Sequence, residues 1–341
     1  MHNLSLIGKV MKEAALSGLR PKINDLILHV TNRCNMRCRH CFVSFDNPQK
    51  ELTLDEIRSV AKVIPDPIWL NIGGGEPLLR NDLEEIISLF DFCELGLPTN
   101  GWDTDRTVAR MEKIHRMTAG KLIASLSLDG LQKIHDAMRC PGSFDRVLRT
   151  FRDLKKIKGL RVKFNTVLCE ANSGEVLELM RFVKTLRPAF HSIILLRGSP
   201  LDPSMRLPSW EKIEALEKEI YSIQQSYDYG RTGVLSRVQR NYQAYKRDLA
   251  EKILREKRQV VPCLAGRSHL VVWADGNVAP CELLSFVGNI RTESLDALLN
   301  GEKMQTAIAR IRASACFCTH DCNMIENILF NPRTYRKLLV S

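Results

Sequence analysis

The chain has no long hydrophobic run and few aromatic residues. No apolar stretch approaches the ~18 residues of a membrane-spanning helix, and the N-terminal segment lacks the charged start, apolar core and cleavage site of a signal peptide. Aromatic side chains make up only 6% of the 341 residues, although hydrophobic residues make up 44%. The sequence therefore predicts a globular cytoplasmic protein that buries a full core, and not a membrane-spanning or secreted one.

Disulfide bonds are not expected either, although the chain has 11 cysteines. Their number is odd, and a reducing compartment keeps thiols free. Eight of them fall in two groups, at 34–41 and 263–322, and thiolates that share a soft metal must converge in this way. The isolated Cys93 and Cys169 are expected to be buried as small apolar residues, and Cys140 is expected to have no functional role.

The net charge of +11 is concentrated in two segments. Residues 146–163 hold eight Lys and Arg against one Asp, and residues 237–258 hold eight against three acids, which gives +7 and +5. We interpret both as solvated helix faces; the alternative is attraction to an anionic partner such as a phosphorylated substrate or lipid headgroups. Interleaved aromatic residues are sparse there, so nucleic acid is not favoured.

Short apolar runs alternate with amphipathic segments between residues 25 and 200. One amphipathic segment, 53–64, opens with Thr53 and Glu56 in the spacing of a capping box. The alternation predicts an α/β fold, a parallel sheet with right-handed crossovers that curves as a partial (β/α)6 TIM-like barrel, with its chemistry at the carboxyl ends of the strands. The six predicted strands are 26–30, 68–72, 94–98, 122–128, 162–168 and 192–196.

The composition divides the chain into four parts. An amphipathic helix at 4–20 is expected to pack against the barrel, because its polar face has too few basic residues to favour a membrane surface. Asp275 and Gly276 form a hairpin signal between two short strands in a small C-terminal α+β domain. The predicted parts are an N-terminal helix (1–24), the barrel (25–208), a helical bridge divided near Tyr229 and Gly230 (209–258) and the C-terminal domain (259–341).

The first cysteine group, Cys34, Cys38 and Cys41, directly follows the first predicted strand. Three cysteines do not complete a structural zinc site, although His40 is available as a fourth ligand. On a 4Fe-4S cluster, three thiolates leave one iron open, and this arrangement is reactive. The spacing C-x3-C-x2-C resembles the motif of the radical S-adenosylmethionine (radical SAM) enzymes, in which the open iron binds the cofactor and an electron cleaves it to a 5'-deoxyadenosyl radical.

Other segments resemble further parts of the radical SAM pattern. The stretch GGGEP after the second strand is similar to the element that holds the methionine amino group: glycines let the backbone approach a ligand, and a glutamate pairs with an ammonium. In the family, an aromatic residue near the adenine stands where this chain has His40, a serine contacts the ribose, and an arginine lies near the cofactor carboxylate. The resemblance thus implies cofactor contacts at Gly74, Gly75, Glu76, Pro77, His40, Asn100, Ser127, Arg139 and Asn165.

The second cysteine group resembles the auxiliary-cluster domains called SPASM and, in shortened form, twitch. A full SPASM domain has seven or more cysteines, so the five present here imply one auxiliary 4Fe-4S cluster. The favoured ligands are Cys263, Cys281, Cys318 and Cys322, with Cys316 or His320 as alternatives. A zinc site is the other interpretation of this group.

The resemblance implies a radical SAM enzyme that abstracts hydrogen from an unactivated carbon and leads to oxidation or carbon-carbon bond formation. A peptide-binding domain does not fit before residue 34, so a small molecule, anionic, sugar-like or lipid-like, is preferred over a ribosomal peptide. A reductant such as flavodoxin or ferredoxin is expected, and peripheral membrane contact is compatible with the basic segments. No catalytic acid or base stands out, although Arg197 after strand six suits an anionic group. A non-catalytic iron-sulfur or zinc module is the remaining alternative.

Overall fold

The computed structural model describes residues 2–16, 22–43, 45, 50–227, 233–313, 316–319 and 321–339. The chain forms two compact units. The first unit comprises Met1–Arg33, Ser44–Gly96 and Asp248–Ser341, and the second comprises Cys34–Val43 and Leu97–Arg247. The cysteine loop therefore belongs to a different unit from the residues on either side of it.

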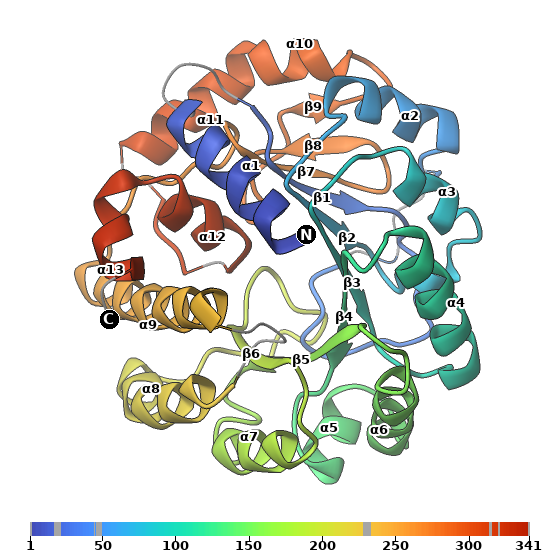
Figure 1. Cartoon of the computed structure of the whole chain (residues 1–341), viewed down its shortest axis with the longest axis vertical. Helices are drawn as coiled ribbons and strands as arrows, with labels where there is room; N and C mark the ends of the chain where they lie inside the picture. Colours follow the sequence, from blue (N-terminus) through green and yellow to red (C-terminus); the bar gives the residue numbers. More distant parts are fainter. Residues whose placement is uncertain are drawn as a thin grey trace. The chain divides into compact units, whose positions relative to one another are not determined.

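Strands and helices alternate along most of the chain (Figure 1). The strands are β1 (Asp25–His29), β2 (Trp69–Gly73), β3 (Glu94–Thr99), β4 (Leu122–Ser127), β5 (Arg161–Leu168), β6 (Phe190–Leu195), β7 (His269–Val272), β8 (Asn277–Ala279) and β9 (Gly288–Asn289). The helices are α1 (His2–Leu16), α2 (Leu54–Val63), α3 (Leu83–Ser88), α4 (Thr104–Met117), α5 (Gln132–Met138), α6 (Ser143–Leu154), α7 (Val176–Thr185), α8 (Trp210–Gln225), α9 (Gly233–Glu256), α10 (Leu295–Asn300), α11 (Glu302–Arg312), α12 (Asp321–Leu329) and α13 (Tyr335–Leu339), with short 3-10 turns η1 (Pro77–Leu79) and η2 (Pro332–Thr334).

In the first unit, β1 lies between two parallel neighbours. Asp25 is opposite Trp69 of β2 on one side and opposite His269 of β7 on the other. β3 continues the parallel sheet beyond β2, whereas β8 and β9 extend it beyond β7 in antiparallel order. The C-terminal segment thus adds strands directly to the first strand, a pairing that its separate composition did not predict.

In the second unit, β4, β5 and β6 form a parallel sheet whose two faces differ. Leu126, Phe164 and His191 lie on the buried face, where the Phe164 ring packs 4.6 Å from the Phe151 ring of α6. Alternate residues of β5 on the other face are only half-buried. This polar face carries the residues discussed below.

The predicted fold class is confirmed. All six predicted barrel strands are present, parallel within each unit and displaced by at most two residues from their predicted limits. The capping box at Thr53 and Glu56 starts α2, and the hairpin at Asp275 and Gly276 joins β7 to β8, with Gly276 at φ 88°. Tyr229 and Gly230, predicted to divide the helical bridge, lie outside the described residues.

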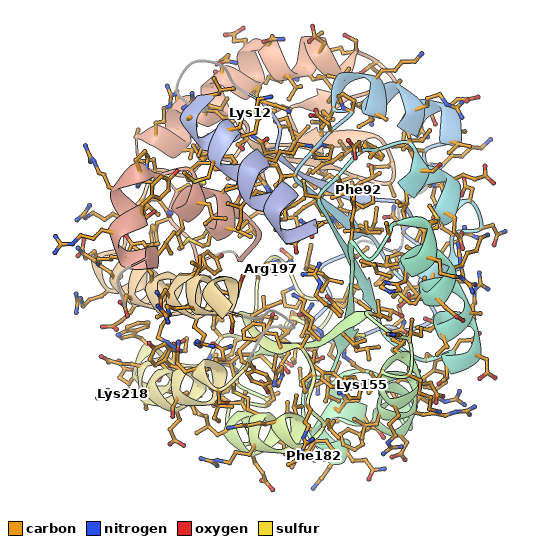
Figure 2. All side chains as sticks on the ribbon, viewed as in Figure 1. Lys12, Phe92, Lys155, Phe182, Arg197 and Lys218 are labelled. Carbon is orange, nitrogen blue, oxygen red and sulfur yellow. The ribbon has the colours of Figure 1, made fainter. Side chains whose placement is uncertain are left out.

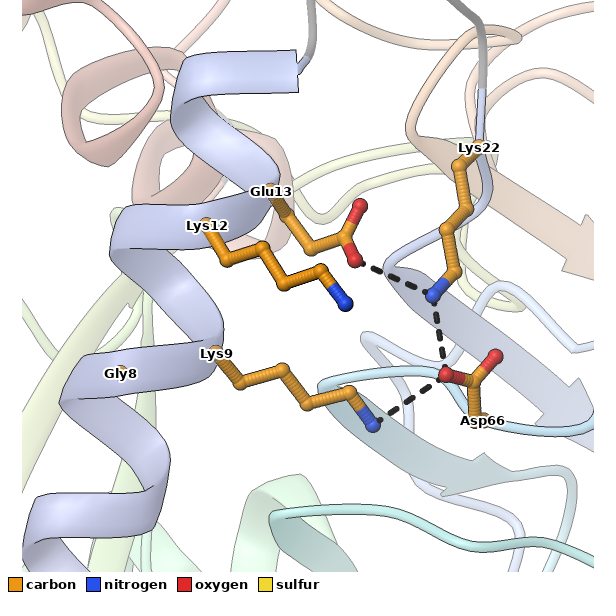
Figure 3. A pocket seen from close by; sticks show the side chains of 6 residues that line it. All are labelled: Gly8, Lys9, Lys12, Glu13, Lys22 and Asp66. Atoms are coloured by element: carbon orange, nitrogen blue, oxygen red, sulfur yellow. Dashed lines mark hydrogen bonds and ion pairs between the residues drawn. The ribbon is translucent and has the colours of Figure 1, made fainter.

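Helix α1 packs its apolar side on the first unit. Leu6 and Ala14 are buried in a cluster that includes Trp69 and Phe330. Next to this apolar side, Lys9 of the helix and Lys22, which follows the helix, form ion pairs with Asp66 at 3.6 and 2.9 Å, and the Lys22 ammonium lies 3.3 Å from Glu13 (Figure 3). Contacts within the protein therefore occupy one side of α1, whereas Ile7 and Met11 on the opposite side are exposed.

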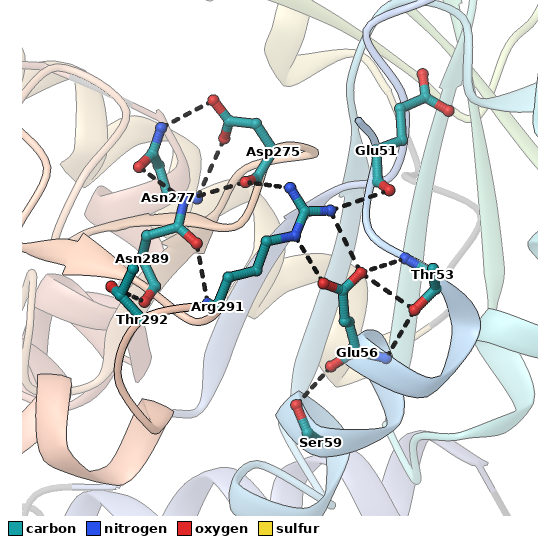
Figure 4. Close-up of polar contacts among 9 residues, drawn as sticks. All are labelled: Glu51, Thr53, Glu56, Ser59, Asp275, Asn277, Asn289, Arg291 and Thr292. Carbon is teal, nitrogen blue, oxygen red and sulfur yellow. Dashed lines mark hydrogen bonds and ion pairs between the residues drawn. The ribbon is translucent and has the colours of Figure 1, made fainter. Parts of the chain in front are cut away.

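A polar cluster connects the C-terminal hairpin with the start of α2 (Figure 4). The Arg291 guanidinium donates to the Glu56 carboxylate at 2.6 Å and to the Asp275 carbonyl at 3.2 Å. Asn289 also donates to the Asp275 carbonyl, at 3.1 Å. Since Arg291 and Glu56 are far apart in sequence, this cluster fixes the C-terminal segment onto the sheet of the first unit.

Among the residues that the structure describes, no helix combines the length and apolarity that crossing a membrane requires.

Candidate active site and metal centres

The cysteine loop directs hydrogen-bond donors at its sulfur atoms. The Met36 amide donates to Cys34 Sγ at 3.4 Å, and Arg139 Nη1 lies 3.6 Å from Cys38 Sγ. Cys38 is buried, and Cys34 and Cys41 are half-buried. Burial raises the pKa of the Cys38 and Cys41 thiols, while Arg139 opposes this effect at both. Thiolates in this loop therefore need a neutralising cation, which is the role of iron in a cluster.

A buried ionic network lies behind this loop. Asp129 is fully buried, accepts from Arg139 Nε at 2.5 Å and from the Val167 amide at 2.8 Å, and lies 3.5 Å from His40 Nε2. Burial alone would raise the pKa of Asp129, but Arg139, His40, His135 and the Val167 amide together outweigh it and hold that pKa at about 2. Burial lowers the pKa of His40 to about 4. The arginine that the family pattern placed near the cofactor carboxylate is thus bonded to Asp129 and directed at Cys38.

The segment after β6 forms hydrogen bonds with the cysteine loop. Leu201 donates its amide to the Cys41 carbonyl at 2.8 Å, and Asp202 donates to the Arg39 carbonyl at 2.9 Å. The Arg39 side chain returns a bond to the Asp202 carboxylate at 2.7 Å. Nothing in the spacing of the sequence indicated this attachment, because it joins segments about 160 residues apart.

The GGGEP segment lies in the first unit, against the chain that leads into the cysteine loop. The Gly75 amide donates to the Thr31 carbonyl at 2.7 Å, and the Glu76 amide donates to the Arg33 carbonyl at 2.9 Å. A Cβ on Gly74 would lie 2.3 Å from the Thr31 oxygen, and one on Gly75 would lie 2.2 Å from the Arg33 oxygen. Glycine is required here by close backbone approach within the protein, in addition to any approach by a ligand.

Glu76 and Pro77 complete this segment. Glu76 is buried, and its carboxylate accepts from the Leu78 amide at 3.3 Å, so that it caps the turn that begins at the buried Pro77. This contact orients the carboxylate that the family pattern assigns to the cofactor ammonium.

Asn100, Ser127 and Asn165 occupy three different environments in the second unit. Asn100 donates to the Asn35 side chain at 2.7 Å and its Nδ2 lies 3.9 Å from Cys34 Sγ, so it braces the cysteine loop. Ser127 ends β4 directly opposite Asn165 of β5. The buried Oδ1 of Asn165 accepts no hydrogen bond from the described residues, and this suits a donor from a bound ligand.

The second cysteine group is assembled in the first unit. Cys281 is buried, Cys263, Cys316 and Cys318 are half-buried, and Asn323 donates to Cys281 Sγ at 3.3 Å. Burial raises the pKa of Cys263 to about 11 and that of Cys281 to about 12; the neighbouring thiols Cys316 and Cys318 add to the increase at Cys263 and Cys281, respectively. These four cysteines therefore lie near one another. His320 and the side chain of Cys322 lie outside the described residues.

Sequence reasoning missed a contact beside this group. His29, the last residue of β1, stacks on Trp273 with ring centroids 4.2 Å apart. Its Nε2 lies 3.2 Å from the carboxylate of Glu282, which follows Cys281 in the chain. The position of His29 at the carboxyl end of a barrel strand is the signal that would have identified it.

Two of the three isolated cysteines, Cys93 and Cys169, have the predicted buried environment. Cys93 and Cys169 are buried in separate apolar clusters, and Cys140 is half-buried.

Two family models match the chain. The model of the radical SAM superfamily matches residues 28–183, and the model of the SPASM iron-sulfur cluster-binding domain matches residues 263–323. The chain carries a radical SAM domain followed by a SPASM domain.

The curated relatives of this radical SAM enzyme include GTP 3',8-cyclases. That of Aquifex aeolicus (strain VF5) is 32% identical over 185 residues, which cover 50% of this chain and 56% of the relative. Molybdenum cofactor biosynthesis protein 1 of Dictyostelium discoideum is 29% identical over 192 residues, 53% of this chain and 29% of the relative. The matched part spans about half the length of the cyclases and less of the Dictyostelium protein.

Solved structures share the fold. Streptococcus suis SuiB bound to its precursor peptide SuiA superposes with a TM-score of 0.63 at 15% identity, over 88% of this chain and 70% of SuiB. Native anSMEcpe with bound AdoMet gives a TM-score of 0.55 at 17% identity, over 92% of this chain and 95% of the other. At these identities the likeness concerns the fold alone.

The two domains imply the cofactors that the cysteine spacing predicted. These are a 4Fe-4S cluster with S-adenosylmethionine for the radical SAM domain and a 4Fe-4S cluster for the SPASM domain. The residues present fit these groups: the first cysteine loop offers three thiols with donors directed at their sulfur atoms, and Asn165 offers an unused buried acceptor.

Proposed function

We propose that this radical SAM enzyme abstracts a hydrogen atom from an unactivated carbon of an anionic small molecule. When bound and reduced, the first cluster supplies the electron that cleaves S-adenosylmethionine to the 5'-deoxyadenosyl radical. The protein's part is to bind the substrate, orient one carbon toward that radical and exclude water.

The observation that carries this proposal is a cation on the polar face of β4–β6. In the strand register, Ser125 lies opposite Lys163, and Asn165 lies opposite Ser192. Lys163 Nζ donates to Ser192 Oγ at 3.4 Å, on the face opposite to the one that packs on α6. A half-buried ammonium in a row of hydroxyl and amide groups is suited to binding a phosphate or carboxylate.

Two further observations support an anionic substrate. Arg197 follows β6, and its guanidinium lies 5.1 Å from the centroid of the Phe42 ring, beside the cysteine loop (Figure 2). The relatives that match the radical SAM half of the chain are named for a cyclisation of GTP, which is an anionic nucleotide. By contrast, Lys155 of the basic segment 146–163 is exposed, so much of that segment is a solvated helix face.

The other site assignments remain part of this proposal. We assign Cys34, Cys38 and Cys41 to the first cluster, and Cys263, Cys281, Cys318 and Cys322 to the auxiliary cluster, with Cys316 or His320 as the alternative. Contacts to S-adenosylmethionine are assigned to Gly74, Gly75, Glu76, Pro77, His40, Asn100, Ser127, Arg139 and Asn165. The domain limits 1–24, 25–208, 209–258 and 259–341 and a flavodoxin or ferredoxin reductant belong to the same proposal.

The test uses the Lys163→Met variant and the reconstituted enzyme under anaerobic conditions, with GTP as the probe anion. We expect GTP to increase 5'-deoxyadenosine formation by the wild type and K163M to raise the KM for GTP roughly tenfold or more, because one charge-assisted contact is lost. Lys218→Met is the matched control, since Lys218 is an exposed lysine of α8 (Figure 2) and should leave the KM unchanged.

Other outcomes would overturn the substrate class while leaving the radical chemistry intact. If peptides, but neither GTP nor other phosphorylated small molecules, increase 5'-deoxyadenosine formation, the enzyme is a peptide maturase. If K163M and K218M have the same KM for an anion that increases 5'-deoxyadenosine formation, Lys163 does not bind that anion. Mass analysis of the product then shows whether two hydrogens are lost, and nuclear magnetic resonance shows whether a new carbon-carbon bond has formed.

A further inference from the structure

Three buried side chains with metal-binding atoms meet in the first unit, apart from both cysteine groups. Asp25 begins β1, His269 begins β7 and Glu326 lies in α12. Each is fully buried, and one ligand atom of each, an imidazole nitrogen or a carboxylate oxygen, lies within 4.8 Å of the others. Their sequence separation of up to about 300 residues shows that only the folded chain assembles this group.

Neighbouring groups orient both carboxylates. Asn71 Nδ2 donates to one oxygen of Asp25 at 2.8 Å, and the Ser268 hydroxyl donates to one oxygen of Glu326. Ser268 in turn accepts from Asn24 Nδ2 at 3.2 Å. Hydrogen bonds of this kind hold the ligands of metal sites in place. In both Asp25 and Glu326 the bond occupies one carboxylate oxygen and leaves the other for a metal ion.

Two buried atoms of the group, Glu326 Oε2 and His269 Nε2, lack a hydrogen-bond partner among the described residues, and the Glu326 oxygen is the one that faces the other ligand atoms. Glu326 Oε2 has no hydrogen-bond partner among the described residues, and the nearest polar group given for it, His269 Nδ1 at 3.9 Å, is itself bonded to Asp25 at 3.1 Å. If Glu326 is ionised, a buried negative charge lacks a donor; if it is protonated, a buried hydroxyl lacks an acceptor. In the ionised state, which is costly to bury without a partner, a bound cation would satisfy this oxygen.

We propose that Asp25, His269 and Glu326 bind one divalent transition-metal ion, with zinc preferred. One imidazole nitrogen and two carboxylate oxygens form a donor set that zinc accepts, and a bidentate carboxylate would supply a fourth donor atom. The two charges of the cation neutralise both carboxylates. Because all three side chains are inaccessible to solvent, the ion is structural: it joins β1, β7 and α12 and does not act on substrate.

The competing account is that Glu326 keeps a proton. Burial first, and then the Asp25 charge, raise the pKa of Glu326 well above its ordinary value, which makes the neutral acid the reference state without metal. The Glu326→Gln variant separates the two accounts, because an amide mimics the neutral acid but is a poor replacement for a carboxylate ligand.

The experiment measures zinc in the reconstituted holoenzyme after incubation with zinc chloride and removal of excess metal. We expect one zinc ion per chain by elemental analysis. Its X-ray absorption spectrum should show nitrogen and oxygen neighbours at ~2.0–2.1 Å and no sulfur at ~2.3 Å, which excludes zinc at the cysteines. E326Q and H269Q should reduce the bound zinc at least tenfold, whereas His191→Gln, in another fully buried histidine on β6, should retain it.

Three results would overturn the proposal: substoichiometric zinc in the wild type, zinc bound only by sulfur, or full zinc retention in E326Q. If zinc is substoichiometric or bound only by sulfur, an E326Q melting temperature equal to that of the wild type would show that Glu326 is a protonated, neutral acid. The wild-type spectrum decides the question even if a variant fails to fold, and it is independent of the substrate proposed above.

Discussion

Arg139 is the buried cation beside the cysteine loop, and its orientation depends on one carboxylate. Asp129 binds Arg139 Nε, which leaves Nη1 directed at Cys38 Sγ. Both side chains are almost entirely inaccessible to solvent. An ion pair in this environment is weak evidence for stability by itself, but loss of one partner leaves an uncompensated buried charge.

The Asp129→Asn variant should therefore unfold more easily than the wild type by ~3 kcal/mol. It should also change the spectrum of the reduced first cluster in electron paramagnetic resonance, because Arg139 is released. Urea unfolding and that spectrum are the measurements. The control is Asp202→Asn, the half-buried partner of Arg39, which should cost less stability than D129N because solvent screens that pair. Equal stability of D129N and wild type would show that the pair does not hold Arg139.

Glu56 connects pH to the attachment of the C-terminal segment. The hydrogen bond from Arg291 is the largest influence on this carboxyl and, with the Thr53 bonds, lowers its pKa to about 2. A pKa lowered by folding stabilises the folded state above the unfolded pKa of ~4.3, and the benefit disappears as the pH falls toward 2.

At neutral pH, Glu56→Gln should destabilise the protein by ~1 kcal/mol or less, because the pair is partly exposed and screened by solvent. The difference between E56Q and wild type should shrink between pH 5 and pH 3. Urea unfolding of the cluster-free chains at several pH values measures it, and a difference that stays constant over this range would contradict the prediction.

At the scale of elements, the loop after β2 packs against the segment that follows β1. Gly74 and Gly75 approach the backbone of residues 31–33 so closely that no side chain fits. The chain then continues directly into Cys34. Steric strain in this loop should therefore reach the first cluster even though Gly75 binds no iron.

Replacement of Gly75 by alanine should lower the rate of 5'-deoxyadenosine formation roughly tenfold or more, because small displacements of a cofactor site are costly. Gly174→Ala is the matched control, since its Cβ would meet nothing within 4 Å. The measurements are the initial rate and the iron content of both variants. A G75A enzyme as active as G174A would show that the loop tolerates displacement.

At the scale of the whole molecule, the two cysteine groups are expected to hold separate clusters. The reconstituted wild type should contain ~8 irons, and the Cys34/Cys38/Cys41 triple alanine variant should contain ~4 and lose cofactor cleavage. A Cys263/Cys281 double alanine variant should likewise lose ~4 irons. Cys140→Ala, an isolated cysteine, is the control and should keep all of them. Zinc in place of iron would contradict the assignment of the second group.

Local patterns account for what could be predicted. The six barrel strands, the capping box at Thr53 and the hairpin at Gly276 depend on residues close in sequence, so periodicity and spacing reveal them. The same holds for the first cysteine motif. The pairings of Asp129 with His40, of Asp202 with Arg39 and of His29 with Glu282 could not be predicted, because the two members of each pair lie far apart in the chain.

The sequence by itself determined the alternation of strands and helices, the two cysteine groups and hence the radical SAM family, since these are properties of short segments. Only the tertiary structure decided that β7 pairs with β1, that Arg139 is directed at Cys38 by Asp129, and that Asp25, His269 and Glu326 share one buried site. The physical reason is that burial and electrostatic energies depend on distance in space, and residues such as Asp25 and Glu326 become neighbours only when the whole chain has packed.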